Sequence, residues 1–166
     1  MRQTLINVGL ILVLWTAGFA ASAEPAMSED MAYLFAAARY LNVQKEQGNS
    51  ILSATAALKA RAIPRKDFYK ALEDSRAFAL KEWDEGYVKT RKPLVPITFK
   101  DLDERIQRSR DLREAACKAW LGQPKKNPLE LKSANKLFYD SMELEQQLLS
   151  EVAKALVVAT RNKKAN

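Results

Sequence analysis

The sequence predicts an all-α protein, an antiparallel bundle of four long helices and one short helix that follows a cleaved signal peptide. Apolar residues recur at spacings of three and four along nearly the whole chain, which is the period of an α-helix. No segment alternates between polar and apolar residues between hairpin turns, so no sheet is expected. Five glycines and six prolines in 166 residues are too few for a fibrous or disordered chain.

The N-terminus has the three parts of a secretory signal peptide. Arg2 is basic, residues 5–21 are almost wholly apolar, and residues 21–23 form a small-residue cleavage site. A membrane-spanning helix needs about 20 apolar residues, more than this run supplies. Cleavage after Ala23 leaves residues 24–166, a length that suits one domain. We therefore expect a periplasmic or secreted protein with no transmembrane segment after processing.

The first long helix is expected to begin at Ser28, a candidate N-cap, and to end at Gly48 and Asn49. Ser50 is then expected to cap a short second helix. Pro64 stops that helix, because proline lacks the backbone N–H that a helix interior needs.

The third helix is expected from about Arg65 to about Tyr87. Residues 88–97 are expected to form an extended basic connector, because Pro93 and Pro96 each restrict the residue before them. This connector joins the third helix to the fourth.

The fourth helix is expected from Thr98, which resembles a capping-box residue, to about Gly122. Asn127 is a candidate N-cap, and Pro128 then occupies the first helical position. The last helix is expected to run from there to about Thr160, which makes it the longest.

The chain carries 27 basic and 20 acidic residues, a net charge of +7. The basic excess lies in acid-free connections and in a tail from about residue 161, so the pattern is not that of a sequence-specific nucleic-acid reader. Lys89, Arg91 and Lys92 in the connector are candidates for docking an anionic surface. The alternative is that these residues serve solubility and loop structure.

Several kinds of chemistry are excluded by what the sequence lacks. There is no histidine, which removes Ser-His-Asp triads and histidine metal sites. There is also no glycine-rich phosphate loop, EF-hand loop or haem attachment motif. Cys117 is the only cysteine and is expected to pack as a small hydrophobic residue. The sequence therefore predicts no metal and no cofactor.

Three charged residues fall at core-facing positions of three helices. Arg76 lies in the inner stripe of the third helix, Arg113 in that of the fourth and Glu145 in that of the last. One interpretation is a buried Arg–Glu network that fixes helix register. The other is a cationic pocket in which Glu145 acts as acid or base. Arg39, beside the first stripe, is expected to join either arrangement.

The sequence therefore predicts an exported helical protein that works by binding a protein partner or an anionic envelope surface. The alternative is a small histidine-free enzyme that acts on an anionic metabolite in the Arg/Glu-lined pocket; of the two, an enzyme is the less expected. A partner-binding surface is expected from tyrosines that flank the stripes. These are Tyr33, Tyr40, Tyr69, Tyr87 and Tyr139.

Overall fold

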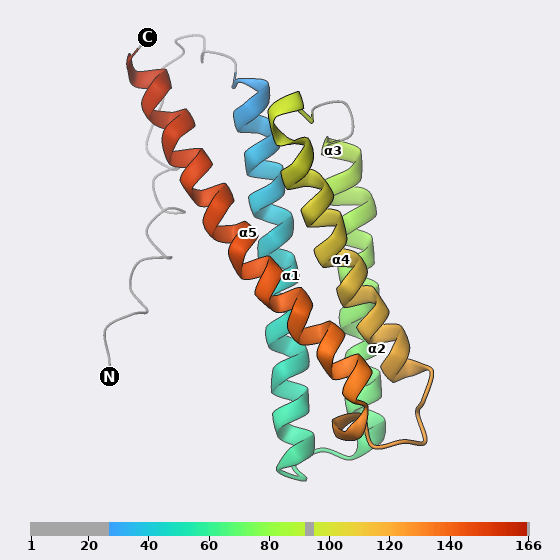
Figure 1. Ribbon diagram of the computed structural model, residues 1–166. Helices are drawn as coiled ribbons and strands as arrows, with labels where there is room; N and C mark the ends of the chain where they lie inside the picture. Colours follow the sequence, from blue (N-terminus) through green and yellow to red (C-terminus); the bar gives the residue numbers. More distant parts are fainter. Residues whose placement is uncertain (1–26, 92–94, 166) are drawn as a thin grey trace, which may run out of the picture.

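A computed structural model describes residues 27–91 and 95–165 (Figure 1). The predicted signal peptide lies outside the described residues. Every regular element within them is helical, which confirms the all-α class. The long helices are α1 (Glu29–Lys59), α2 (Arg65–Lys81), α4 (Lys100–Leu121) and α5 (Lys132–Ala165). The short elements are the π-helix η1 (Glu82–Val88), α3 (Lys89–Arg91) and the 3-10 turns η2 (Ile97–Phe99) and η3 (Pro128–Glu130).

The helices pack side by side, with α5 against α4 and α1, and with α2 against α1 and α4. In Figure 1 the α1–α2 turn and the α4–α5 connection lie at the lower end of the bundle, and α3 lies at the upper end. No helix in the described ranges combines the length and apolar character needed to cross a membrane.

Helix α1 is continuous, so the predicted break after Gly48 and the separate short helix are wrong. The Ser28 side chain caps the helix as expected, accepting a hydrogen bond from the backbone N–H of Met31 at 3.3 Å. A glycine inside a helix costs only about 1 kcal/mol relative to alanine, which packing readily offsets. A Cβ at residue 48 would lie 3.0 Å from Nη1 of Arg113. Gly48 therefore makes room for a buried arginine instead of ending the helix.

The extended connector predicted for residues 88–97 is wrong at its start. The helix that begins at Arg65 continues through η1 and α3 to Arg91. Pro93 disfavours the helical conformation only at the residue directly before it, which leaves residue 91 free to remain helical. Residues 92–94 lie outside the described part of the chain.

Two predicted helix starts have different outcomes. Thr98 lies inside η2, and α4 begins at Lys100 with no side-chain cap, so the predicted capping box is wrong. Asn127 does act as a cap, because its Oδ1 accepts a hydrogen bond from the backbone N–H of Leu129 at 3.2 Å. The turn that it caps is a 3-10 helix, and α5 begins only at Lys132.

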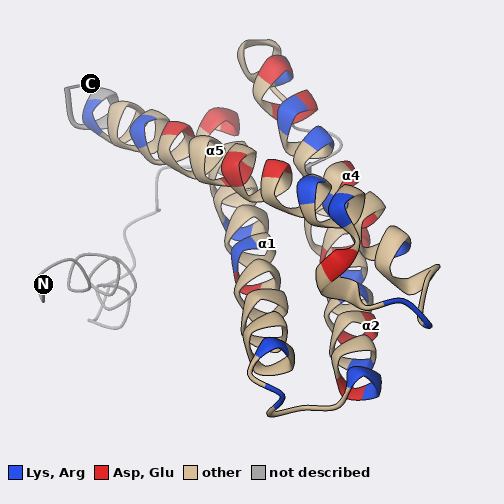
Figure 2. Cartoon of the chain, turned by 60° about the horizontal axis from the view of Figure 1, so that its bottom comes forward, with Lys and Arg blue, Asp and Glu red and all other residues tan. Residues whose placement is uncertain are grey.

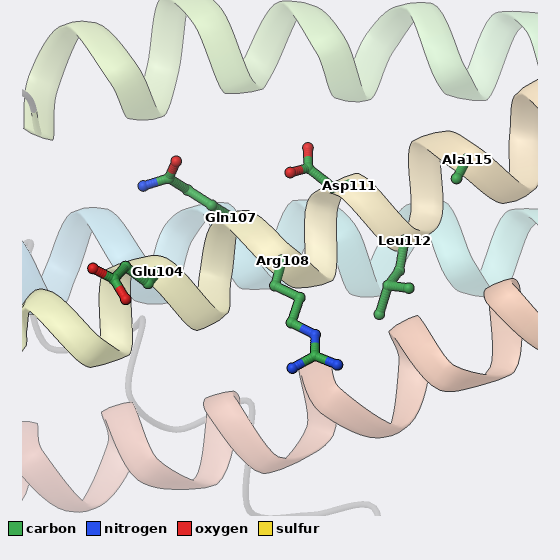
Figure 3. A pocket seen from close by; sticks show the side chains of 6 residues that line it. All are labelled: Glu104, Gln107, Arg108, Asp111, Leu112 and Ala115. Atoms are coloured by element: carbon green, nitrogen blue, oxygen red, sulfur yellow. The ribbon is translucent and has the colours of Figure 1, made fainter.

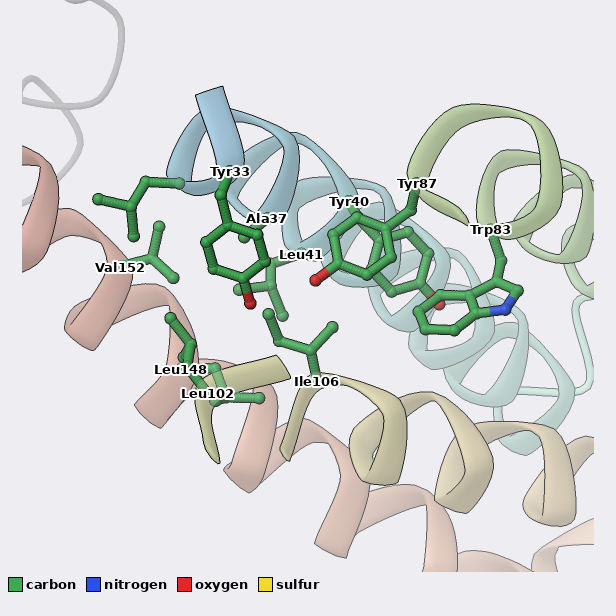
Figure 4. Packing of buried hydrophobic residues seen from close by; sticks show 11 residues of the cluster. Tyr33, Ala37, Tyr40, Leu41, Trp83, Tyr87, Leu102, Ile106, Leu148 and Val152 are labelled. Atoms are coloured by element: carbon green, nitrogen blue, oxygen red, sulfur yellow. The ribbon is translucent and has the colours of Figure 1, made fainter. Parts of the chain in front are cut away.

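The core consists of two apolar clusters with a polar layer between them. The upper cluster (Figure 4) contains Tyr33, Leu34, Ala37, Tyr40, Leu41, Trp83, Tyr87, Leu102, Ile106, Leu148 and Val152. The lower cluster contains Ile51, Phe68, Tyr69, Leu72, Ala116, Cys117, Trp120, Leu131, Ala134 and Phe138. The polar layer, at mid-height on α1, α4 and α5, consists of the buried residues Gln44, Gln47, Ser109, Arg113, Ser141 and Glu145.

The expected tyrosine surface is wrong for four of its five members. Tyr33, Tyr40, Tyr69 and Tyr87 are buried in the two clusters, and only Tyr139 is exposed, at 57 %. Cys117 packs in the lower cluster as expected, and burial raises the pKa of its thiol to about 11.

Candidate functional site

Arg113 and Glu145 form a buried ion pair in the middle of the polar layer. Arg113 Nη2 donates to Glu145 Oε2 at 2.7 Å, and the two side chains are 2 % and 6 % exposed. The other guanidinium nitrogens are also used, because Nε donates to Ser141 Oγ at 2.6 Å and Nη1 donates to the Gln44 carbonyl at 3.1 Å. The guanidinium also lies over the ring of Phe138, 5.0 Å from its centroid. Arg113 thus ties α4 to both α1 and α5.

Burial works against both charges of this pair. It lowers the pKa of Arg113 and raises the pKa of Glu145, and the attraction between the two only partly offsets it. A buried pair of this kind adds little net stability, but removing one partner strands the other charge in the core. The pair thus links α4 to α5, and Arg113 also reaches α1 through the Gln44 carbonyl.

Arg76 does not join this pair, which corrects the expected three-residue cluster. It pairs instead with Glu114 of α4, donating from Nε to Oε2 at 2.9 Å and from Nη2 to Oε1 at 2.5 Å. Arg39 also lies elsewhere. It is 73 % exposed and reaches Glu82 of η1 at 3.6 Å. The charges predicted to converge are thus distributed over three separate ion pairs.

The void beside these pairs is too small for a metabolite. It measures about 10 Å³ and is lined by residues that include Arg76, Arg113, Gln44 and Arg110. Gln44 Oε1 and Arg110 Nε have no hydrogen-bond partner within the described residues. A space of this size holds about one water molecule, whereas ligand pockets measure about 300–1,000 Å³.

Sequence reasoning missed a buried carboxylate in the upper cluster. Asp103 is 5 % exposed, and its Oδ1 accepts hydrogen bonds from the hydroxyls of Tyr87 at 2.9 Å and Tyr33 at 3.4 Å. Its Oδ2 accepts from Gln107 Nε2 at 2.8 Å. Burial raises the pKa of Tyr87, and the Tyr33 hydroxyl and Asp103 add to that shift. Asp103 follows Leu102 in the inner stripe, which is the only signal that the sequence offered.

A shallow hollow lies over the outer surface of α4 (Figure 3). Its volume is about 380 Å³, but all of its lining residues come from one helix. They include both acidic and basic side chains, such as Glu104, Arg108 and Asp111, and they do not converge on one point. The hollow therefore has neither the walls nor the charge of a binding site.

Unpaired positive charge gathers at the lower end of the bundle, which comes forward in Figure 2. Seven exposed cations from the α1–α2 turn and the α4–α5 connection meet there with two exposed carboxylates, Asp67 and Glu130. We call the seven cations the basic end. They are Lys59, Arg61, Arg65, Lys66, Lys125, Lys126 and Lys132. Within the described residues, none of the seven forms an ion pair. The ion pairs described there are formed by other cations along the helices.

The two segments of the basic end are held together by hydrogen bonds that leave its charges free. Arg65 Nη1 donates to the carbonyl of Lys125 at 2.9 Å. The hydroxyl of Tyr69 lies 3.1 Å from the Gln123 carbonyl and 3.3 Å from that of Lys126. These bonds hold the α4–α5 connection against α2, so the cations of the connection have a fixed position relative to those of α2.

A cleft of about 350 Å³ opens beside the basic end. It lies between the last turns of α1, the end of α4, η3 and the first turns of α5. Trp120 and Phe138 form part of its wall, and the exposed Tyr139 and Lys59 lie among its lining residues. This volume falls in the range of small-molecule sites.

The upper end of the bundle differs in its charge. Lys89, a docking candidate from the sequence, is exposed there, and nothing is described of the side chains of Arg91 and Lys92. Exposed carboxylates stand among the described cations of this end. They are Glu29, Asp30, Asp84, Glu85 and Asp101.

No family model matches the chain, and comparisons with curated proteins and with solved structures find no match. Among the described residues, no group of three or more acidic, cysteine or histidine side chains is placed to hold a metal ion.

Proposed function

We propose that this chain is an exported protein that works by binding, and that its basic end docks on an anionic phospholipid surface of the cell envelope. The observation that carries the proposal is the set of seven exposed cations, unpaired within the described residues, at one end of the bundle. Basic residues near an anionic bilayer each contribute about 1 kcal/mol of binding free energy. Seven on one end form a polybasic surface of the kind that binds such bilayers.

The proposal includes two predictions made from the sequence. The first is that neighbouring helices run antiparallel, an order that brings the α1–α2 turn and the α4–α5 connection to one end. The second is that the signal peptide is cleaved after Ala23, which delivers the protein to the outer surface of a membrane or to the periplasm. N-terminal sequencing of protein recovered from the periplasm or the medium is expected to begin at Glu24, and retention of Met1 would contradict export with cleavage.

Vesicle co-sedimentation tests the docking. The purified protein is expected to sediment with phosphatidylglycerol vesicles and to remain in the supernatant with phosphatidylcholine vesicles. Binding to phosphatidylglycerol is expected to be lost as the salt concentration rises above about 0.1 M, because screening weakens exposed charge pairs. Lys125→Glu/Lys126→Glu is expected to weaken binding by about thirtyfold or more. The matched control, Lys100→Glu/Lys154→Glu, makes the same charge change at exposed positions away from the basic end.

Equal loss of binding in the two double variants would show that net charge alone matters and would contradict a defined docking surface. Failure of the wild type to bind phosphatidylglycerol vesicles at low salt would refute the lipid target. A protein partner, the other target predicted from the sequence, would then be the hypothesis to test. The enzyme alternative has less support, because the void beside Arg76 and Arg113 holds only about one water molecule.

A further inference from the structure

We infer that the cleft beside the basic end binds one hydrocarbon chain of an anionic lipid, with the headgroup held at Lys59. The inference rests on the proposed function, because the lipid surface that the basic end contacts supplies the chain. It goes beyond that function by assigning a ligand site with a defined apolar wall and a defined cation.

Three polar side chains of the cleft wall, those of Trp120, Asn135 and Thr55, already have hydrogen-bond partners within the protein. Trp120 Nε1 lies 3.2 Å from Asn135 Oδ1 and 3.3 Å from the Pro128 carbonyl. Asn135 Nδ2 donates to the Leu129 carbonyl at 3.0 Å. Thr55 Oγ1 donates to the Ile51 carbonyl in its own helix at 2.7 Å. The wall therefore offers few free hydrogen bonds to a polar ligand and favours an apolar one.

The apolar part of the wall consists of large side chains from different helices. Leu52 comes from α1, Trp120 from α4 and Phe138 from α5. Trp120 and Phe138 are 3 % and 2 % exposed, and their ring centroids lie 5.4 Å apart, so this side of the cleft is fixed by the core. Tyr139 is 57 % exposed and also lines the cleft, and its large apolar ring can cover an incoming chain.

Lys59 supplies the charge that selects an anionic ligand. It is an exposed lining residue of the cleft, and within the described residues it forms no ion pair. Its ammonium is one of the seven cations of the basic end, so an anionic headgroup near it lies in the same positive field. An alkyl chain with an anionic end matches both the apolar wall and this cation.

Calorimetric titration with decyl phosphate, kept below the concentration at which it forms micelles, tests the site. The wild type is expected to bind decyl phosphate more tightly than decanol. Thr55→Phe places a ring in the cleft and is expected to weaken binding by about tenfold or more, since the chain and the ring compete for one space. Lys59→Gln is expected to weaken binding of decyl phosphate by about three- to fivefold, the scale of one partly solvated charge pair, and to leave decanol binding unchanged.

Thr160→Phe is the matched control for the cleft variant. Thr160 is exposed on the last turns of α5, and its hydroxyl donates to the Leu156 carbonyl at 2.7 Å, in the same i to i−4 pattern as Thr55. Its substitution is expected to leave decyl phosphate binding unchanged. Circular dichroism melting of both variants shows that each is folded.

Two outcomes would overturn the inference. One is no heat of binding for the wild type, and the other is equal binding by the wild type and a folded Thr55→Phe variant. Vesicle binding separates these failures from failure of the proposed function. Thr55→Phe retains all seven cations and is expected to bind phosphatidylglycerol vesicles as the wild type does. Vesicle binding by a wild type that does not bind decyl phosphate refutes the cleft alone. Decyl phosphate binding without vesicle binding refutes surface docking.

Discussion

The polar layer at the middle of this bundle and the basic end below it differ in whether their charges have partners. Each guanidinium nitrogen of Arg113 has a partner within hydrogen-bond distance, and its side chain is 2 % exposed. The cations of the basic end are exposed and form no ion pair within the described residues. A paired, buried charge fixes the fold, whereas an unpaired, exposed charge remains available to a ligand.

The largest expected effect is on the polar layer. Glu145→Gln leaves Arg113 buried without a counter-charge and is expected to lower the free energy of unfolding by about 3–5 kcal/mol. Urea denaturation measures this loss. Glu143→Gln, at an exposed position one half-turn away, is expected to change stability by less than about 0.5 kcal/mol. A loss below about 1 kcal/mol for Glu145→Gln would show that solvent reaches the pair and would reopen the pocket interpretation.

Gly48 tests how tightly Arg113 is held. Gly48→Ala raises helix propensity but places a methyl group 3.0 Å from Arg113 Nη1, so the guanidinium must shift and strain its bond to the Gln44 carbonyl. Overpacking of about 1–3 kcal/mol exceeds the propensity gain of about 1 kcal/mol, so a net loss of about 1 kcal/mol is expected. An increase in melting temperature would mean that the guanidinium adjusts freely.

The Arg76–Glu114 pair is intermediate, since its side chains are 30 % and 13 % exposed. Partial burial raises the pKa of Glu114, but the hydrogen bonds and charges of Arg76 and Lys118 together outweigh it and hold the pKa below its usual value of 4.5. The carboxylate therefore stabilises the fold above pH 4.5 and loses this effect as the pH falls through the lowered pKa.

Glu114→Gln is expected to lower stability by up to about 1 kcal/mol at neutral pH. The difference from the wild type is expected to shrink in acid, as the wild-type carboxylate takes up its proton. Denaturation curves at several pH values measure the trend. A difference that grows as the pH falls would contradict the assigned direction of the pKa shift.

The smallest stability effect is expected at the basic end. Lys125→Glu/Lys126→Glu removes repulsion between like charges and no described ion pair, so stability is expected to change by less than about 0.5 kcal/mol. Unchanged stability together with a large loss of vesicle binding would show that the basic end serves binding, in contrast to the polar layer, which serves stability. A large loss of stability would show that these lysines serve the fold.

The sequence predicted the polar layer better than the basic end, for a physical reason. Helical periodicity shows which residues point inward, so Arg113 and Glu145 were found from their positions in two apolar stripes. Periodicity does not show how far each helix is rotated or shifted against its neighbour. For that reason it missed Glu114 as the partner of Arg76.

The basic end depends on topology. Lys125 and Lys126 lie in one of the acid-free connections, but the contact of this connection with Arg65 follows only once the two connections are known to share one end. The same limit applies to Gly48. Its local pattern matched a helix end, and only the neighbouring Arg113 explains why a glycine is there.

The most direct test of the account is to find which end of the protein meets the membrane. Two variants, Ser133→Cys and Thr98→Cys, are each labelled with a fluorophore. Residue 133 lies beside Lys132 at the basic end, and residue 98 lies at the upper end. The native Cys117 is buried with a raised pKa of about 11 and is expected to stay unlabelled. On phosphatidylglycerol vesicles, a lipid-attached quencher is expected to quench the label at residue 133 and to leave the label at residue 98 unchanged. Quenching at residue 98 alone would contradict the account and assign docking to the connector with Lys89, Arg91 and Lys92.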